Sequence, residues 1–278
     1  MNLNRPNPPL RIGLIGAGWV TQHHLAGWRQ ITDRASVVAI ADPNRAQAEA
    51  RAREHGIEGV FSSAEQMLDA VELDAVDIAA PREFHAPLVR LAAARGLAVL
   101  CQKPLAPTFD EAQALVDEVA SQCRLMVHEN WRFRPCYRDL STWLREGRIG
   151  EVVQAQLTLF TSGLIADAQG KLPALERQPF IATLDRALVM EVLIHHIDTL
   201  RFLLGDLTLQ HARLGHASAA MRGEDRAFMS FETGSGAPVA LMANFSVHGR
   251  PAAQADRLTL VGTRGTIELE GDTLACFG

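Results

Sequence analysis

Ile12-Gly-Leu-Ile-Gly-Ala-Gly-Trp-Val-Thr21 is a short apolar run that continues directly into a glycine-containing loop. Glycines at the first two loop positions permit a tight turn and let backbone N–H groups approach a pyrophosphate at a helix N-terminus. The third position usually holds Gly or Ala for close helix–strand packing, and Thr21, although small, departs from that pattern. The stretch therefore predicts a strand, a helix and, between them, a phosphate-binding loop made by Gly16, Ala17, Gly18, Trp19 and Val20.

An acidic residue follows at the end of the next apolar run. Asp42 comes directly after residues 37–41, about 20 residues beyond the loop, where a carboxylate can hydrogen-bond a ribose 2′-hydroxyl. A carboxylate at this position repels a 2′-phosphate. The loop and Asp42 together predict a dinucleotide site that takes NAD, while the nearby Arg45 keeps NADP possible.

The first part of the chain alternates between buried strands and amphipathic helices. Continuous apolar runs are typical of strands that helices cover on both faces, as in a parallel sheet. Residues 1–128 are therefore expected to form a doubly wound α/β Rossmann domain that binds NAD(P). The apolar runs lie at residues 12–15, 37–41, 75–79, 97–101 and 125–127, and the helical stripes at Phe84, Leu88 and Leu91 and at Ala112, Leu115, Val116 and Val119.

The pattern changes after residue 128. Longer strand-like runs, separated by short turns that contain glycine, favour a mostly antiparallel open sheet. Residues 129–278 are therefore expected to form an α+β domain, with a long loop at 162–183 that could cover a site. Strands are expected at 152–160, 227–231, 239–247, 258–261 and 266–269, and helices at 137–145 and 188–204.

Composition excludes several classes of protein. The chain has 47% hydrophobic and 21% charged residues and a net charge of −5, without a basic run, so we expect no nucleic-acid partner. It has neither the ~18 consecutive apolar residues of a membrane span nor a basic-then-apolar leader. Its four cysteines form no Cys-x-x-Cys pair, which argues against a zinc site or disulfides and favours the cytoplasm.

A lysine ends the strand expected at residues 97–101. In an open α/β sheet, a side chain at the carboxyl end of a strand points into the ligand crevice. Lys103 is therefore a candidate for proton transfer or for binding a substrate hydroxyl. A surface lysine before the loop proline Pro104 is the simpler reading of these residues alone.

One helix carries three ionisable residues on one side. At ~100° per residue, Glu191, His195 and Asp198 fall within about a 60° arc, opposite an apolar stripe. His196 falls near the apolar side, and we expect it to be structural. The ionisable face could be an ordinary solvent-exposed stripe.

Two chemical readings of this face remain. A carboxylate and an imidazole could hold a divalent metal, but no third clustered His or Cys supports this, and we expect no metal site. In combination with a nucleotide-binding fold, the face suits acid/base chemistry. His195 would take a hydroxyl proton as hydride leaves for the cofactor, and Glu191 would orient or charge the histidine.

With these motifs in order, the chain resembles the glucose-fructose oxidoreductase / inositol dehydrogenase family (Gfo/Idh/MocA). The resemblance covers nearly the whole chain. It rests on Gly13-Leu-Ile-Gly-Ala-Gly-Trp-Val-Thr-Gln-His-His24, Pro81-x-x-x-His85, Gln102-Lys-Pro104, Asn130-Trp-Arg-Phe-Arg-Pro135 and Glu191-x-x-x-His195-x-x-Asp198 before Arg201-Phe-Leu-Leu-Gly205.

The resemblance implies a Rossmann domain, an open-sheet domain for substrate binding and oligomerisation at residues 129–278, and NAD(P)-dependent oxidation of a sugar or polyol hydroxyl. It implies that Lys103 is the lysine of a Glu-Lys-Pro motif, close to both cofactor and substrate, and that His195 is the acid/base histidine. By the same resemblance, Pro81 and His85 lie in a loop beside the cofactor, whereas Asp198, Asn130 and Arg132 contact the substrate.

The chain departs from the family pattern in three ways. Gln102 stands where the family usually has Glu, which removes a charge beside the lysine. Glu191 stands where Asp is common, so its carboxylate is shifted by about a bond length. The chain ends at Gly278, where family members usually continue, so we expect a shorter second domain.

Two functions follow as hypotheses. The first is an NAD-dependent dehydrogenase acting on a secondary hydroxyl of a sugar, polyol or sugar acid. The alternative, motivated by Gln102 and the early chain end, is a catalytically weak nucleotide-binding sensor or partner subunit; a metal-dependent hydrolase is a distant third. Because an open sheet must cover its exposed face, a homodimer or homotetramer is expected.

Overall fold

The computed structural model describes residues 8–253 and 256–278. The chain divides into two compact units, Met1–His128 and Glu129–Gly278, and each is described by itself.

The first unit is built on a six-stranded sheet in which every neighbouring pair of strands is parallel. Its order, β3-β2-β1-β4-β5-β6, is that of a doubly wound Rossmann fold. The expected fold class of this part of the chain is therefore confirmed. The strands are β1 (Leu10–Ile15), β2 (Ala35–Ala41), β3 (Gly59–Phe61), β4 (Ala75–Ile78), β5 (Ala98–Gln102) and β6 (Leu125–His128).

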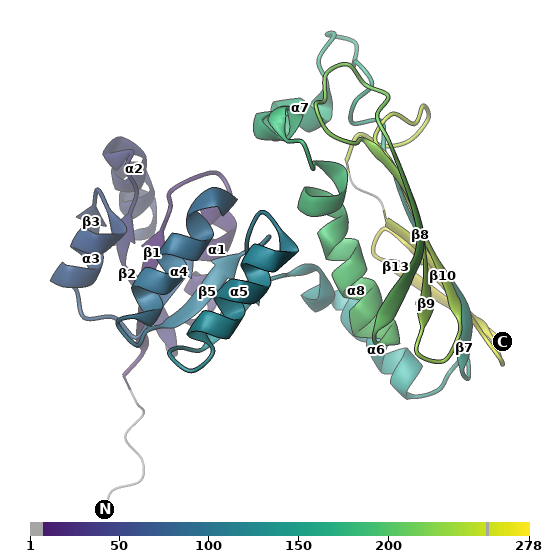
Figure 1. The fold of residues 1–278 in the computed structure, drawn as a ribbon, viewed down its shortest axis with the longest axis horizontal. Coiled ribbons are helices and arrows are strands. Elements are labelled where there is room, and N and C mark those ends of the chain that lie inside the picture. Colours follow the sequence, from purple (N-terminus) through teal and green to yellow (C-terminus); the bar gives the residue numbers. More distant parts are fainter. Residues whose placement is uncertain (1–7, 254–255) are drawn as a thin grey trace, which may run out of the picture. The chain divides into compact units, whose positions relative to one another are not determined.

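Helices cover both faces of this sheet (Figure 1). Because successive strand residues point to opposite faces, Leu14 packs with α1 and α2 whereas Ile15 packs with α3, α4 and α5. The side chains of Asn44, Ser63 and Thr108 cap α2, α3 and α5. The helices are α1 (Thr21–Trp28), η1 (Arg29–Ile31), α2 (Arg45–His55), α3 (Ala64–Ala70), η2 (Arg82–Phe84), α4 (His85–Ala93) and α5 (Phe109–Val119).

Two sequence predictions in this unit need correction. Of the stripe Phe84, Leu88 and Leu91, the two leucines lie on α4 and pack partly buried against the core, but Phe84 does not. Phe84 belongs to the 3-10 turn η2 and is 58% exposed, so the helix begins one residue later, and its fully buried residues are His85, Val89, Ala92 and Ala93. Strand β3 was not predicted, because three partly buried residues are too few to show a period.

The second unit is built on a seven-stranded sheet of order β13-β12-β11-β7-β10-β9-β8. Only β7 and β10 run parallel, so the sheet is mostly antiparallel, as expected. The strands are β7 (Val152–Phe160), β8 (Leu207–Gly215), β9 (Arg226–Thr233), β10 (Pro238–Asn244), β11 (Asp256–Gly262), β12 (Thr266–Glu270) and β13 (Thr273–Phe277).

Helices α6 and α8 pack on one face of this sheet (Figure 1). Tyr137 and Leu140 of α6 and Leu200 of α8 are buried in one core with inward-facing sheet residues such as Leu157 and Leu241. The helices are η3 (Trp131–Phe133), α6 (Pro135–Arg145), α7 (Pro173–Arg177), η4 (Pro179–Thr183), η5 (Leu188–Leu193) and α8 (Ile194–Leu204).

Three predictions for this unit need correction. The segment 162–183 is not loop throughout, because Pro173 and Pro179 each begin a short helix, where a missing N–H costs nothing. The helix expected at 188–204 is a π-helix (η5) up to Leu193 and an α-helix from Ile194. The edge strand β8 was missed, because it is exposed almost throughout and shows no alternation.

Candidate functional site

The glycine loop has the geometry that its sequence predicts. Gly16 has a φ of 106°, and a Cβ at this position would lie 2.6 Å from the carbonyl oxygen of Ala79, so the loop needs glycine here. Gly18 has no neighbour within 4 Å of a built Cβ, which leaves its backbone open to a ligand. The Thr21 hydroxyl donates to the carbonyl oxygen of Gly18 at 2.6 Å and begins α1. The loop and the helix start thus fit a pyrophosphate.

Asp42 is held against the same loop. Its Oδ2 accepts the N–H of Ala17 at 2.7 Å, and its Oδ1 accepts the N–H of Asn44 at 2.7 Å. A carboxylate has about four lone-pair sites, so two backbone bonds leave capacity for a sugar hydroxyl. The residues present therefore fit a dinucleotide whose ribose lies at the end of β2.

Pro81 and His85 lie in the segment that follows β4. Pro81 is exposed and precedes the turn η2. The ring of His85 is buried, with Nδ1 2.8 Å from the carbonyl oxygen of Pro104 and Nε2 2.8 Å from that of Ala80. The imidazole therefore ties this segment to the turn after β5, and any effect on a cofactor acts through the backbone that it fixes.

Lys103 follows β5 directly, at the carboxyl edge of the six-stranded sheet. Its backbone N–H donates to the side-chain Oε1 of Gln102 at 2.7 Å, and its peptide bond to Pro104 is cis. The structure thus places Lys103 at the same edge as the glycine loop and Asp42, as the strand pattern predicts.

In the second unit, His195 is paired with a carboxylate that the sequence argument did not include. Nδ1 of His195 lies 2.7 and 2.8 Å from the two carboxylate oxygens of Glu129, and both side chains are largely buried. The indole of Trp131 stacks on the imidazole with 4.5 Å between ring centroids. Glu129 also accepts the backbone N–H of Trp131, which holds the carboxylate in place.

The signal for Glu129 was weak but present. Glu129 immediately precedes the Asn130 segment that the motif analysis singled out, at the end of a strand. Its pairing with a residue on α8 depends on the path of the chain between them, which no local pattern contains.

Arg132 and Asp198 form a two-point ion pair. Arg132 Nε donates to Asp198 Oδ2 at 2.7 Å, and its second nitrogen donates to Oδ1. This hydrogen bonding raises the pKa of the Arg132 guanidinium, which also lies over the Phe202 ring. The structure therefore brings together two residues predicted to bind substrate, while Asn130 is exposed at the start of η3.

Glu191 lies on the π-helix η5 and is buried. A π-turn widens the helix, so the uniform 100° spacing used to place Glu191 beside His195 does not hold between them. The Nδ1 partner of His195 is Glu129, and the orienting role of Glu191 stays a prediction.

A second buried carboxylate organises the residues behind His195. Asp256 accepts hydrogen bonds from Trp131 Nε1 at 3.0 Å and from the Tyr137 hydroxyl at 2.9 Å, and its Oδ1 lies 3.0 Å from His196 Nε2. Burial and the charge of Asp256 raise the pKa of Tyr137. His196 is fully buried, in agreement with the structural role expected for it.

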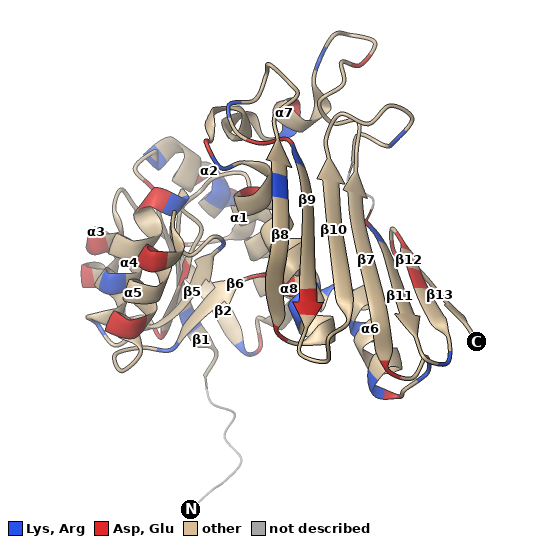
Figure 2. Cartoon of the chain, turned by 45° about the vertical axis from the view of Figure 1, so that its right-hand side comes forward, with Lys and Arg blue, Asp and Glu red and all other residues tan. Residues whose placement is uncertain are grey.

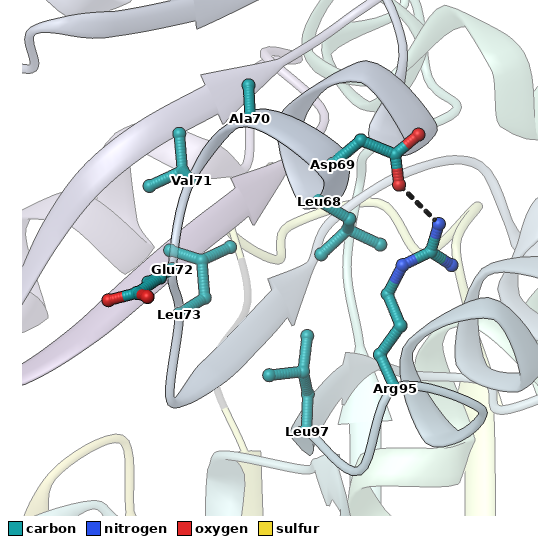
Figure 3. Close-up of a pocket in the computed structure, with 8 residues that line it drawn as sticks. All are labelled: Leu68, Asp69, Ala70, Val71, Glu72, Leu73, Arg95 and Leu97. Atoms are coloured by element: carbon teal, nitrogen blue, oxygen red, sulfur yellow. Dashed lines mark hydrogen bonds and ion pairs between the residues drawn. The ribbon is translucent and has the colours of Figure 1, made fainter.

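A hollow on the first unit lies elsewhere. It surrounds the link between α3 and β4, beside the Asp69–Arg95 ion pair (Figure 3). This link enters the sheet at the amino end of β4, whereas ligands of open α/β sheets bind at the carboxyl ends. Within residues 8–253 and 256–278, no cluster of three or more His, Cys, Asp or Glu residues could hold a metal. No described helix is long and apolar enough to cross a membrane.

Family models and curated relatives match both parts of the chain. Residues 10–129 match the model for an oxidoreductase family with an NAD-binding Rossmann fold, and residues 137–268 match the GFO/IDH/MocA C-terminal domain. D-apiose dehydrogenase from Paraburkholderia graminis is 35% identical over 93% of this chain and 67% of its own length. Inositol 2-dehydrogenase 4 from Saccharopolyspora erythraea is 31% identical over 83% of this chain and 65% of its own.

Solved structures agree. An oxidoreductase from Agrobacterium radiobacter, solved with NAD+, L-tartaric acid and magnesium, has a TM-score of 0.88 at 27% identity over 96% of this chain and 76% of its own. Levoglucosan dehydrogenase in complex with NADH has a TM-score of 0.84 at 25% identity, with the same two coverages. The resemblance carried by the motifs is confirmed: the chain belongs to the Gfo/Idh/MocA family of oxidoreductases.

Proposed function

We propose that this protein is an NAD(P)-dependent dehydrogenase that transfers a hydride between the nicotinamide and a secondary hydroxyl of a sugar, polyol or sugar acid. The observation that carries the proposal is the Glu129–His195 pair, at 2.7 Å, in a chain whose other unit is an NAD-binding Rossmann fold. Relatives named apiose, inositol and levoglucosan dehydrogenases support this substrate class.

The first unit, residues 1–128, holds the cofactor, which supplies the hydride acceptor or donor. The loop amides and the start of α1 bind its pyrophosphate, and Asp42 accepts a ribose hydroxyl, which favours NAD over NADP. The residues proposed to bind the cofactor are Gly16, Ala17, Gly18, Trp19, Val20, Asp42, Pro81 and Lys103, and His85 holds the segment after Pro81 in place.

His195 acts as the acid/base group. An ionised carboxylate only accepts hydrogen bonds, so Glu129 holds the ring proton on Nδ1 and makes Nε2 the nitrogen that takes the substrate proton. The carboxylate then stabilises the imidazolium that forms. Trp131 fixes the plane of the ring. We assign the orienting role to Glu129, with Glu191 as a second carboxylate near the same helix.

The remaining polar residues proposed to bind the substrate are one lysine and three residues of the second unit. Lys103 binds the reacting hydroxyl or shares its proton, and Asn130, Arg132 and Asp198 bind further hydroxyls. Because Arg132 and Asp198 already pair, they present one donor and one acceptor held in fixed register, an arrangement suited to a vicinal diol.

The alternative, a catalytically weak sensor or partner subunit, is not favoured, because the compared relatives are dehydrogenases. Gln102 supplies its remaining argument. The amide nevertheless makes the hydrogen bond to Lys103 N–H that a carboxylate oxygen would make.

The second unit, residues 129–278, also provides an interface for a homodimer or homotetramer. Helices cover one face of its sheet, and Figure 2 shows few charged residues on strands β8, β9, β10 and β7. Phe228 and Phe277 lie among the side chains on the face opposite the helices and are exposed. Light scattering of the wild type and of Phe228→Lys tests this, with the variant expected to shift toward monomer. The four free cysteines support a cytoplasmic location.

The first experiment follows nicotinamide fluorescence while the protein is titrated with NADH and with NADPH. Sugars and polyols, apiose and inositols among them, are then added to the NAD-loaded protein. Preferential NADH binding followed by substrate-dependent reduction is expected. Lys103→Met and His195→Asn should bind NADH and lose turnover; full turnover in either variant contradicts the mechanism. Binding without reduction by any compound favours the sensor.

A further inference from the structure

We propose that Asp77, His24 and Gln102 form a hydrogen-bonded chain, buried at Asp77 and His24, that positions Lys103 for the reaction, with the single ring proton of His24 held on Nδ1. The proposal deepens the proposed function and rests on it for the role of Lys103. None of the three residues touches the substrate, so they are positioning residues.

The chain begins at the backbone of Lys103. Its N–H can only donate, and the atom 2.7 Å away is therefore the carbonyl Oε1 of the Gln102 side chain. This contact fixes the orientation of the amide. The NH2 group of Gln102 must then be the atom that lies 3.0 Å from Nε2 of His24.

The amide in turn fixes the tautomer of His24. An amide NH2 group can only donate, so Nε2 of His24 accepts with its lone pair and carries no proton. The Nδ1 of His128 lies 3.1 Å from the same nitrogen, so with Nε2 unprotonated it can only donate and shares the single lone pair with the amide. The proton of His24 therefore sits on Nδ1, which lies 2.9 and 3.0 Å from the two oxygens of Asp77.

Asp77 anchors the chain as a buried charge. The side chain is fully buried, and Oδ2 also accepts the indole N–H of Trp28 at 2.8 Å. Burial and the negative charge of Asp77 raise the pKa of Cys101 to about 12, so the thiol stays neutral beside it. A buried carboxylate with two neutral donors is fixed in place, because moving it would leave a charge without partners.

This arrangement links four neighbouring elements to the lysine. Asp77 lies on β4, Gln102 on β5, His128 on β6 and His24 on α1. The titratable groups that face His24 are Asp77 and His128, and Gln102 is the neutral link between the imidazole and Lys103. The direction in which donors and acceptors follow one another along these hydrogen bonds depends on the Gln102 amide. A carboxylate at position 102 would face Nε2 and require a second proton on His24.

The sequence itself makes the test selective. The protein contains two lysines, Lys103 and Lys171. Lys171 lies in the second unit and pairs with Glu176 on the surface. Full-length protein labelled with 13C-lysine therefore gives two lysine side-chain signals, one of which is an internal control. Lys103→Arg identifies the Lys103 signal.

We expect Gln102→Leu, which removes both amide contacts, to shift the Lys103 signal and leave that of Lys171 in place. Gln102→Glu keeps an acceptor for the Lys103 N–H, so it should shift the Lys103 signal less than Gln102→Leu does. His55→Gln is the matched control. His55 has a largely buried side chain at the end of α2 and takes no part in the hydrogen bonds of Asp77, His24 and Gln102, so this variant should move neither signal. An unchanged Lys103 signal in Gln102→Leu overturns the positioning role.

The protonation of His24 is read separately from 15N-labelled histidine. The wild type should show one protonated ring nitrogen, Nδ1, whereas Gln102→Glu should show both nitrogens protonated at neutral pH. A proton on Nε2 in the wild type overturns the proposed polarity even if every variant loses stability. Both readouts work without turnover, so they remain decisive if no sugar is oxidised and the proposed function fails.

Kinetics give a third readout. Once a substrate has been found, Gln102→Leu should lower kcat about tenfold with little change in the KM for NAD. Gln102→Glu should keep most of the wild-type kcat. Equal losses in kcat, NADH affinity and thermal stability would mark a purely structural role.

Discussion

At the residue scale, four histidines differ in what their ring nitrogens face rather than in their sequence surroundings. His24 and His195 each place Nδ1 on a carboxylate, His85 places both nitrogens near backbone carbonyls, and His196 faces Asp256. Helical spacing correctly assigned His196 to the core. It could not find Glu129, because a partner 66 positions away is set by tertiary structure.

The first prediction concerns this partner. Glu129→Gln keeps the size of the side chain but removes its charge, so the imidazolium formed during hydroxyl oxidation loses its stabilising partner. We expect kcat to fall by roughly 10- to 100-fold, with the affinity for NADH unchanged. Steady-state kinetics and a fluorescence titration measure the two quantities.

Glu65→Gln, on an exposed position of α3, is the matched control and should behave as the wild type. A Glu129→Gln enzyme with wild-type kcat would show that His195 works without this carboxylate, and attention would return to Glu191.

A second residue-scale prediction concerns the thiols. Cys101 is buried, and desolvation together with the charge of Asp77 raises its pKa to about 12. At pH 8 only about one part in 10⁴ is thiolate, the form that reacts with iodoacetamide. Mass spectrometry of briefly treated native protein should find label on the exposed Cys276 and none on Cys101. Equal labelling of both would contradict the burial of β5.

At the element scale, the sequence predicts the helices and strands whose apolar residues form a clear pattern. Strand β7 has the predicted bounds, and all five predicted parallel strands differ by at most two residues at either end. Such patterns do not predict β8, in which buried and exposed residues do not alternate. They also do not predict η5, in which the helix has π rather than α geometry. The two proline-initiated helices α7 and η4 are too short to show any period.

Asp256 holds several elements of the second unit together, and its contacts lead to a prediction about stability. This one buried carboxylate receives side chains from η3, α6 and α8 while it lies on β11. Asp256→Ala leaves several donors without an acceptor, and we expect it to lower the free energy of unfolding by about 3–5 kcal/mol. Urea unfolding followed by tryptophan fluorescence measures the change.

Asp272→Ala is the control for this variant. Asp272 is exposed and pairs with Arg134, the same cation that approaches Asp256 at 3.3 Å. Removal of this surface partner should cost less than about 1 kcal/mol. Comparable losses in the two variants would mean that burial of Asp256 contributes nothing.

At the scale of the whole molecule, each unit has its own core, and the proposed catalytic residues are divided between them. Lys103 belongs to the first unit and His195 to the second. The sequence predicted this division because each residue ends or lies on an element with a recognisable pattern. The carboxylate Glu129 and the chain beneath Lys103 were not predicted, because their partners come from several elements at once.

The two cores make a joint prediction about alkaline pH. Burial raises the pKa of Cys101 from 9.0 to about 12 in the first unit, and burial with the charge of Asp256 raises that of Tyr137 in the second. Above the unfolded-state values of about 9 and 10, the unfolded chain loses protons that the native state keeps. As far as these two groups are concerned, the free energy of unfolding should therefore stay constant below pH 9. Above pH 9 it should fall, and each group contributes a decrease of up to ~1.4 kcal/mol per pH unit.

Urea unfolding between pH 8 and pH 11 measures this fall, and Cys101→Ala and Tyr137→Phe should each make it shallower. Tyr137 is the one tyrosine of the chain, so the absorbance of tyrosinate reports its ionisation directly. The signal should stay absent from the native protein at pH 11 and appear together with unfolding. Tyrosinate absorbance in a protein that keeps its native circular dichroism would contradict the buried Tyr137–Asp256 contact, because an anion there would face a second buried negative charge.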